Sequence, residues 1–194
     1  PRSIELGAVY DMPVYVASSF SNEPGTLIHG GEHTMEVRKA VTGIAIDRNV
    51  GKITVRGVID RPGVAAGLLQ PLADAGVSVD VIVQNASSDG TTDFTFTVAQ
   101  ASVDRAAEVI GRDSTVQYAE VVTGSDLAKV SIVGTGMENA PGYAARMFST
   151  LSEVGVNIDM ITTSEIRITT IIDRDQVQKA VKALHDAFEL EKSE

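Results

Sequence analysis

The stretch DRPGVAAGLLQPLADAGVSVD, residues 60–80, decides the fold of this chain, because it returns at residues 139–159 as NAPGYAARMFSTLSEVGVNID. The two segments align without gaps and share eight of 21 positions, where chance would give about one. Each copy opens with Pro-Gly, continues with the apolar pattern of a helix, and ends at a Gly-Val pair that leads into a strand. The chain therefore carries an internal repeat, and the repeat is the best guide to its architecture and function.

Composition and charge limit the classes of function. The 194 residues are 43% hydrophobic and 22% charged, which is typical of a globular protein. No apolar run approaches the roughly 18–20 residues of a membrane span, and no secretory signal is visible, so we expect a soluble, cytoplasmic protein without a membrane partner. The net charge of −10 argues against nucleic acid as a partner. The absence of cysteine excludes disulfides and thiolate metal sites.

The N-terminal part of the sequence indicates a separate segment followed by a linker. A short helix is expected before Pro13, and VYVASSF (residues 14–20) alternates like a strand. Residues 21–36 gather Pro, Gly, Ser and Asn without any apolar period, which is typical of a linker. We therefore expect a domain boundary in this stretch.

The rest of the sequence predicts two α+β units of the ferredoxin-like βαββαβ type. In the first, DRNVGK (residues 47–52) is expected to form a turn before a strand at 52–58, followed by a helix at 62–75 and a strand at 77–85. After a turn at SSDGTT (residues 87–92), a strand that carries Phe94, Phe96 and Val98, a helix at about 102–112 and a strand at 116–122 are predicted. In the second, they are predicted at 129–134, 141–154, 156–163, 166–172 and 174–188. The second unit thus lacks its fourth strand, while a strand at about 40–47 has no place in the first. We expect residues 40–47 to complete the second sheet and to cover an edge that would otherwise be open.

The Pro-Gly loop of the first copy has the chemistry of an amino-acid receptor. Pro62 suits the first position of a helix, and behind it the amides of Gly63, Val64 and Ala65 are expected at the positive end of that helix, where a carboxylate binds. Asp60 could hold an ammonium group beside them. The second copy has Asn139 in place of Asp60, so only the first copy is predicted to bind an amino acid well. The alternative is that Pro-Gly merely begins a helix.

Longer stretches resemble a known family. The segments DRPGVAAGLLQPLADAGVSVDVIVQN and NAPGYAARMFSTLSEVGVNIDMITTSEIRITTII are similar to the paired ACT modules at the C-terminal end of bacterial aspartate kinases, and VYVASSFSNEPGTLI resembles the last strand and linker of their kinase domain. The resemblance implies two ACT modules, the first at residues 49–124 and the second formed by 39–48 with 125–194. It also implies that residues 1–38 are the C-terminal remnant of the kinase domain plus linker.

What the resemblance implies for function is allosteric feedback inhibition of aspartate-family amino-acid synthesis, including lysine biosynthesis. The family binds threonine, often with lysine, between the first module of one chain and the second module of its partner in a homodimer. Carried over by position, the threonine site comprises Asp60, Gly63, Val64, Ala65, Gln84, Asn157 and Ile158. A second, lysine-responsive set comprises Asp80, Ser164 and Glu165. Residues 61, 64 and 71 differ from the usual pattern, and Pro71 is expected to bend the first helix.

Catalytic chemistry is not expected from this chain by itself. The catalytic residues of the kinase (ATP:L-aspartate 4-phosphotransferase) have no counterpart here, so ATP and Mg would belong to a kinase domain or subunit that acts as a partner, and no cofactor is expected in this chain. His29, His33 and His185 have no metal-ligand spacing. Three other readings remain open: an ACT-type sensor of a different amino acid such as serine, isoleucine or methionine, a purely structural assembly subunit, and an independent metabolic enzyme.

Overall fold

The computed structural model describes residues 7, 10, 12–21, 24–29, 40–85, 90–112, 115–137 and 141–191. The chain divides into two compact units, residues 1–38 and residues 39–194. Of the short helix expected before Pro13, only Gly7 and Tyr10 are described, and Gly7 is helical. Among the described residues, no helix combines the length and the apolar character that crossing a membrane requires.

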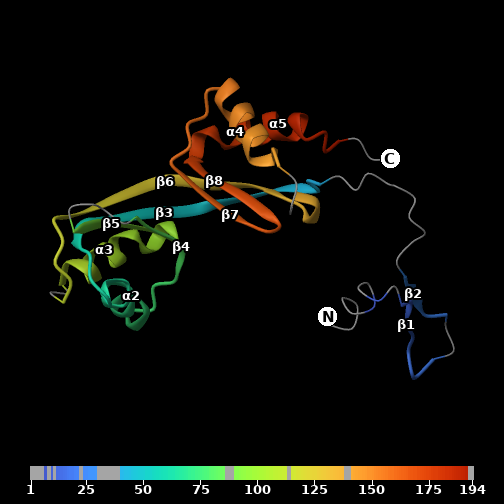
Figure 1. Cartoon of the computed structure of the whole chain (residues 1–194), viewed down its shortest axis with the longest axis horizontal. Helices are drawn as coiled ribbons and strands as arrows, with labels where there is room; N and C mark the ends of the chain where they lie inside the picture. Colours follow the sequence, from blue (N-terminus) through green and yellow to red (C-terminus); the bar gives the residue numbers. More distant parts are fainter. Residues whose placement is uncertain are drawn as a thin grey trace. The chain divides into compact units, whose positions relative to one another are not determined.

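The described part of the second unit is built on one six-stranded antiparallel sheet with the order β4-β5-β3-β6-β8-β7 (Figure 1). The strands are β3 (Gly43–Ile59), β4 (Val79–Gln84), β5 (Thr91–Val98), β6 (Glu120–Val133), β7 (Met160–Ser164) and β8 (Arg167–Asp173). The helices are α2 (Val64–Asp74), α3 (Val103–Arg112), α4 (Tyr143–Glu153) and α5 (Val177–Ala187), with 3-10 turns η1 (Gln100–Ser102), η2 (Thr135–Met137) and η3 (Arg174–Gln176).

The two central strands are longer than the sequence predicts. The expected turn at residues 47–52 is wrong, because β3 runs without a break from Gly43 to Ile59. Likewise, the strands predicted at 116–122 and 129–134 both overlap the single strand β6, which begins at Glu120 and ends at Val133. The residues DRNVGK, which are of types common in turns, instead form a bulge. There the β3–β6 register shifts between Asp47 and Val50 and again between Val50 and Lys52. A bulge accommodates residues such as Asn and Gly while the strand continues with a bend.

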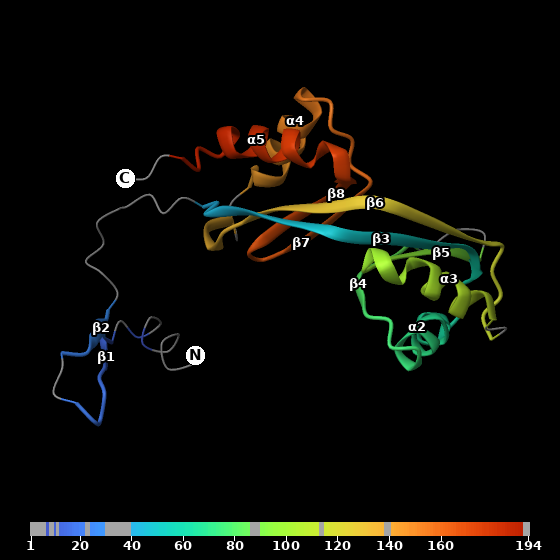
Figure 2. The same ribbon diagram turned by 180° about the vertical axis from the view of Figure 1, so that it is seen from behind.

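The long strands join two ferredoxin-like modules into one sheet. The β3 segment from Gly43 to Asp47 pairs with β6 on the side opposite β8, so it completes the second sheet as predicted for residues 40–47. We call the part built around α2 and α3 the first module and the part built around α4 and α5 the second module. In both views α2 and α3 lie on one side of the sheet and α4 and α5 on the other (Figures 1 and 2).

Each module has its own hydrophobic core. The first packs α2 and α3 on β3 and β5, with fully buried residues that include Ile53, Leu72, Phe94 and Phe96. The second packs α4 and α5 on β6 and β8, and its fully buried residues include Ile132, Met147, Leu151, Ile172 and Leu184. Complete burial of such side chains stabilises each module by about 1.5–3 kcal/mol per residue before the entropy of ordering is subtracted.

The first unit is described by a short hairpin. Strand β1 (Val14–Val16) pairs antiparallel with β2 (Thr26–Ile28), so residues 26–28, expected to be linker, form a strand instead. Large apolar side chains stay exposed on this unit, among them Phe20 (99%) and Tyr15 (60%).

Candidate functional site

The predicted amino-acid site begins at the turn that precedes α2. Gly63 is the N-terminal cap of the helix and has a backbone φ of 94°, a left-handed conformation that glycine adopts without steric cost. A Cβ at this position would meet no atom within 4 Å. Glycine is therefore needed for its backbone angle, and the space above it is open.

Five of the predicted residues line one hollow at this helix end. Its volume is about 430 Å³, and it is lined by Asp60, Arg61, Pro62, Gly63, Val64, Ala65 and Gln84. A hydrogen bond of 2.9 Å from the Asp60 amide to the Gly90 carbonyl holds this loop in place. Gln84 reaches the hollow as the last residue of β4. The turn and the strand end thus bring a carboxylate, a side-chain amide and helix-terminal amides to one place.

Two details of the helix start differ from the sequence prediction. Pro62 precedes the cap and is not the first helical residue, since the helix begins at Val64. The Val64 amide, expected to be free, donates to the Arg61 carbonyl at 3.3 Å. The first bond of the helix joins the Gly67 amide to the Gly63 carbonyl at 2.9 Å, so helix geometry provides no acceptor for the Ala65 amide. The positive end of the helix is retained, with one fewer amide than predicted.

The other two residues predicted for the threonine site lie elsewhere in the chain. Asn157 and Ile158 follow α4 and line a separate hollow of about 430 Å³ with Phe148, Ser152, Gly155 and Val156. Within one chain they do not line the hollow at Asp60. Their role in the site of a partner chain stays a prediction.

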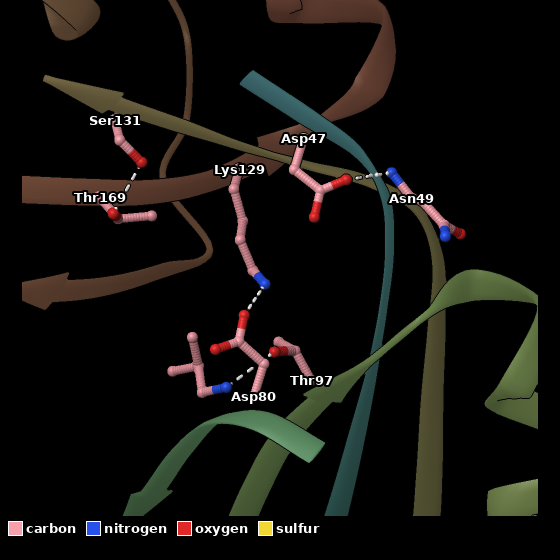
Figure 3. Close-up of polar contacts among 8 residues, drawn as sticks. Asp47, Asn49, Asp80, Thr97, Lys129, Ser131 and Thr169 are labelled. Carbon is pink, nitrogen blue, oxygen red and sulfur yellow. Dashed lines mark hydrogen bonds and ion pairs between the residues drawn. The ribbon is translucent and has the colours of Figure 1, made fainter. Parts of the chain in front are cut away.

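A third hollow, of about 350 Å³, contains part of the predicted lysine set. Asp80 and Ser164 both line it, whereas Glu165 lies outside its lining, in the tight turn between β7 and β8. The Asp80 carboxylate is already paired with the ammonium group of Lys129, which reaches it from β6 (Figure 3). Behind Lys129, a hydrogen bond of 2.7 Å joins the buried hydroxyls of Ser131 and Thr169.

Sequence reasoning missed the cations of this third hollow. Lys129 and Arg167 line it together with Asp80, and neither is among the residues predicted for a site. A signal was present, since KITV at residues 52–55 and KVSI at 129–132 each place a lysine at the first position of corresponding predicted strands. Among the described residues, no group of three or more His, Asp or Glu side chains is arranged to hold a metal ion.

Comparison with known proteins first defines the class. Family models described as ACT domains match residues 53–113 and residues 130–188, which correspond to the two copies of the fold described above. The chain is a protein with two ACT domains.

Relatives with known names then define the family. The chain is 44% identical over 191 residues to the "Aspartate kinase" of Pseudomonas fluorescens, an alignment that covers 98% of the chain and 46% of that protein. It is 45% identical to a chain in the crystal structure of aspartokinase alpha and beta subunits, with a TM-score of 0.73, 78% of this chain covered and 100% of that one. The ligand-free regulatory subunit of Thermus thermophilus aspartate kinase is 38% identical, with a TM-score of 0.72 and coverage of 77% and 99%. The chain belongs to the aspartokinase family, as its regulatory ACT part, and spans about half the length of the Pseudomonas protein.

Proposed function

We propose that this chain senses the amino-acid end products of the aspartate pathway and transmits their binding to a kinase as feedback inhibition. Threonine is the proposed effector at the hollow of Asp60, and lysine is the proposed second effector at the hollow of Asp80. The observation that carries the proposal is the meeting of Asp60, Gly63, Ala65 and Gln84 around one hollow at the start of α2.

The chemistry of the first hollow suits a small zwitterion. The amides at the start of α2 and the helix dipole favour a carboxylate. Asp60 offers its carboxylate to an ammonium group, and the Gln84 amide can bond a side-chain hydroxyl such as that of threonine. Hydrogen bonds to charged groups are each worth about 1.5–3 kcal/mol, so the ligand's two charged ends supply most of the affinity.

A second copy of the chain is the proposed partner that closes the site. The hollow at Asp60 is open on one chain, and Asn157 with Ile158 line a hollow of their own. Strands β4 and β7 are the two edges of the sheet, with Ile82 and Ile161 each nearly half exposed. Exposed edges of this kind favour pairing between chains, and a homodimer would bring the second module of one chain to the first module of the other.

The kinase catalytic part is the proposed source of ATP and Mg chemistry. The two aspartokinase subunit structures cover 78% and 77% of this chain, close to the share that residues 39–194 represent, whereas the Pseudomonas protein covers nearly all of it. The exposed apolar residues of the first unit therefore fit a contact with the catalytic part. Inhibition then requires a coupling free energy of only about 1–3 kcal/mol between effector and kinase sites.

Calorimetry with the purified chain tests this function. Threonine should release heat on binding and raise the melting temperature, and lysine should do so alone or together with threonine. Asp60→Ala should abolish the threonine response while the chain stays folded. Asp104→Ala, which removes an exposed carboxylate from the first turn of α3, should leave the response intact.

The other readings give different results. A sensor of another effector would respond to serine, isoleucine or methionine and not to threonine. A structural subunit would show neither heat nor a thermal shift with any amino acid at millimolar concentration, and Asp60→Ala would then change nothing. Either result would overturn the assignment of threonine.

A further inference from the structure

Two ion pairs cross between the modules of one chain. The Lys129 ammonium, on β6 of the second module, pairs with Asp80 on β4 of the first. The Lys52 ammonium, on β3 of the first module, bonds both carboxylate oxygens of Asp159, just before β7 of the second, at 2.7 and 2.6 Å. Each module thus gives one lysine to the other module and receives one from it.

Each lysine projects from the face of the sheet opposite the helices of its own module. Lys129 lies between Ala128 and Val130, both buried in the core beneath α4 and α5. Because successive side chains of a strand point to opposite faces, Lys129 points away from that core. Lys52 stands next to Ile53, which is buried in the core of the first module, so it also points away from the core of its own module. The pairs therefore join the helix-free faces of the two modules.

The repeat makes the two pairs equivalent. Asp80 and Asp159 are the last residues of the two aligned segments that contain α2 and α4. Lys52 and Lys129 open the corresponding stretches KITV and KVSI, whose second and fourth residues are buried in the two cores. The internal repeat therefore relates the two ion pairs, and each pair joins a lysine of one module to an aspartate of the other. We call the pairs Lys52–Asp159 and Lys129–Asp80 the two latches.

The two latches differ in how open they are. The side chains of Lys52 and Asp159 are 23% and 34% exposed, and the lysine bonds both oxygens. In the other pair the Lys129 side chain is 15% exposed and the Asp80 side chain 67%, and both residues line the 350 Å³ hollow. The Lys52–Asp159 latch is the more enclosed one, and the Lys129–Asp80 latch is accessible from the hollow.

We propose that the paired contacts Lys52–Asp159 and Lys129–Asp80 fix the angle between the two ACT modules, and that the Lys129–Asp80 contact is the one that opens. Strands β3 and β6, which connect the two modules, do not set this angle by themselves. Their pairing shifts register at residues 47–52 of β3, and strands bend at such shifts. A ligand ammonium that approaches Asp80 displaces the Lys129 ammonium and frees the angle. The role of the latches in setting the angle does not depend on which amino acid the protein senses.

The absence of cysteine from the sequence makes the angle measurable. Arg105→Cys on α3 and Lys182→Cys on α5 place one spin label on an exposed position of each module. Distances between the labels are measured by double electron–electron resonance, with labelled chains diluted in unlabelled chains to remove signals between molecules. Lys129→Met and Lys52→Met are made in this background, and circular dichroism establishes that each variant is folded.

We expect a narrow distribution in the parent and a shifted, broader one in Lys129→Met and in Lys52→Met. The exchange Asp80→Lys with Lys129→Asp restores the pair with reversed charges and should narrow the distribution again. Methylammonium chloride, compared with equal ionic strength of sodium chloride, should broaden the parent distribution and leave that of Lys129→Met unchanged. Unchanged distributions in both methionine variants would refute the latch, and broadening by both salts alike would refute displacement at Asp80. Neither result bears on threonine binding at Asp60.

Discussion

The two copies of the repeat have the same backbone and different chemistry. Helices α2 and α4 each have 11 residues. Each is preceded by a left-handed glycine, Gly63 at φ 94° and Gly142 at φ 104°, and is followed by another, Gly76 at 71° and Gly155 at 64°. The hollow of the first copy opens at the start of its helix, whereas that of the second opens near the end of its helix. Duplication kept the backbone turns that define the fold, while the side chains around them diverged.

The largest effect should come from the buried leucines that the copies share. Leu72 and Leu151 occupy the same place in the repeat, and both are fully buried. Each substitution by alanine should lower the free energy of unfolding by about 2–5 kcal/mol through lost burial and a residual cavity. Urea denaturation followed by circular dichroism measures both.

Because β3 and β6 are shared by the two modules, we expect a single transition in each leucine variant. Two separate transitions, with only one of them shifted by each substitution, would show that the modules unfold independently. In that case the two modules would be two separate folding domains and not two halves of one domain.

Exchange of the residues before the Pro-Gly pairs sharpens the functional comparison. Asp60→Asn gives the first copy the residue of the second, and loss of a charged bond worth about 1.5–3 kcal/mol should weaken threonine binding by roughly 10–100-fold. Asn139→Asp, at a position outside the described residues, should not restore it. The position equivalent to Gln84 in the second copy is Thr163, so the side-chain amide is absent there as well. Calorimetry on the two single variants and the double variant gives the answer, and recovery in the double variant would contradict the proposed role of Gln84.

The capping glycines should show a smaller effect that is equal in the two copies. Gly63→Ala and Gly142→Ala place a Cβ on a left-handed residue, which costs about 1–2 kcal/mol each. A Cβ at either position would have no atom within 4 Å, so the cost arises from the backbone alone. Thermal denaturation checks the equality. A much larger loss in one variant would mean that its loop has a packing role that the other lacks.

Local patterns in the sequence were sufficient for most of the fold and for one hollow. The apolar spacing around Leu72 and Leu151 predicts the helices, and the surplus strand at residues 40–47 predicts how the second sheet is completed. The residues 60–65 meet because they are adjacent in sequence, and Gln84 joins them because β4 follows α2 directly. By contrast, Asn49 and Gly51 suggest a turn, and the continuation of β3 past them depends on partners far along the chain, β5 and β6. Long-range pairing overrides local turn preference in this way.

The ion pairs between the modules are also long-range, and they should have the smallest effect on stability. Lys52 and Asp159 are 107 residues apart, and Lys129 and Asp80 are 49 apart, so no local pattern joins them. Partly exposed pairs contribute about 0.2–1 kcal/mol.

Double-mutant cycles with Lys52→Met and Asp159→Asn, and with Lys129→Met and Asp80→Asn, measure each coupling by urea denaturation. The first should be the larger, because its carboxylate is the less exposed and accepts two bonds. Salt at about 1 M should reduce the coupling of the exposed pair more, since screening acts most strongly on solvent-exposed charges. The contact that opens more readily has to be the weaker of the two. A larger coupling free energy for Lys129–Asp80 than for Lys52–Asp159 would therefore contradict the proposal that Lys129–Asp80 is the contact that opens.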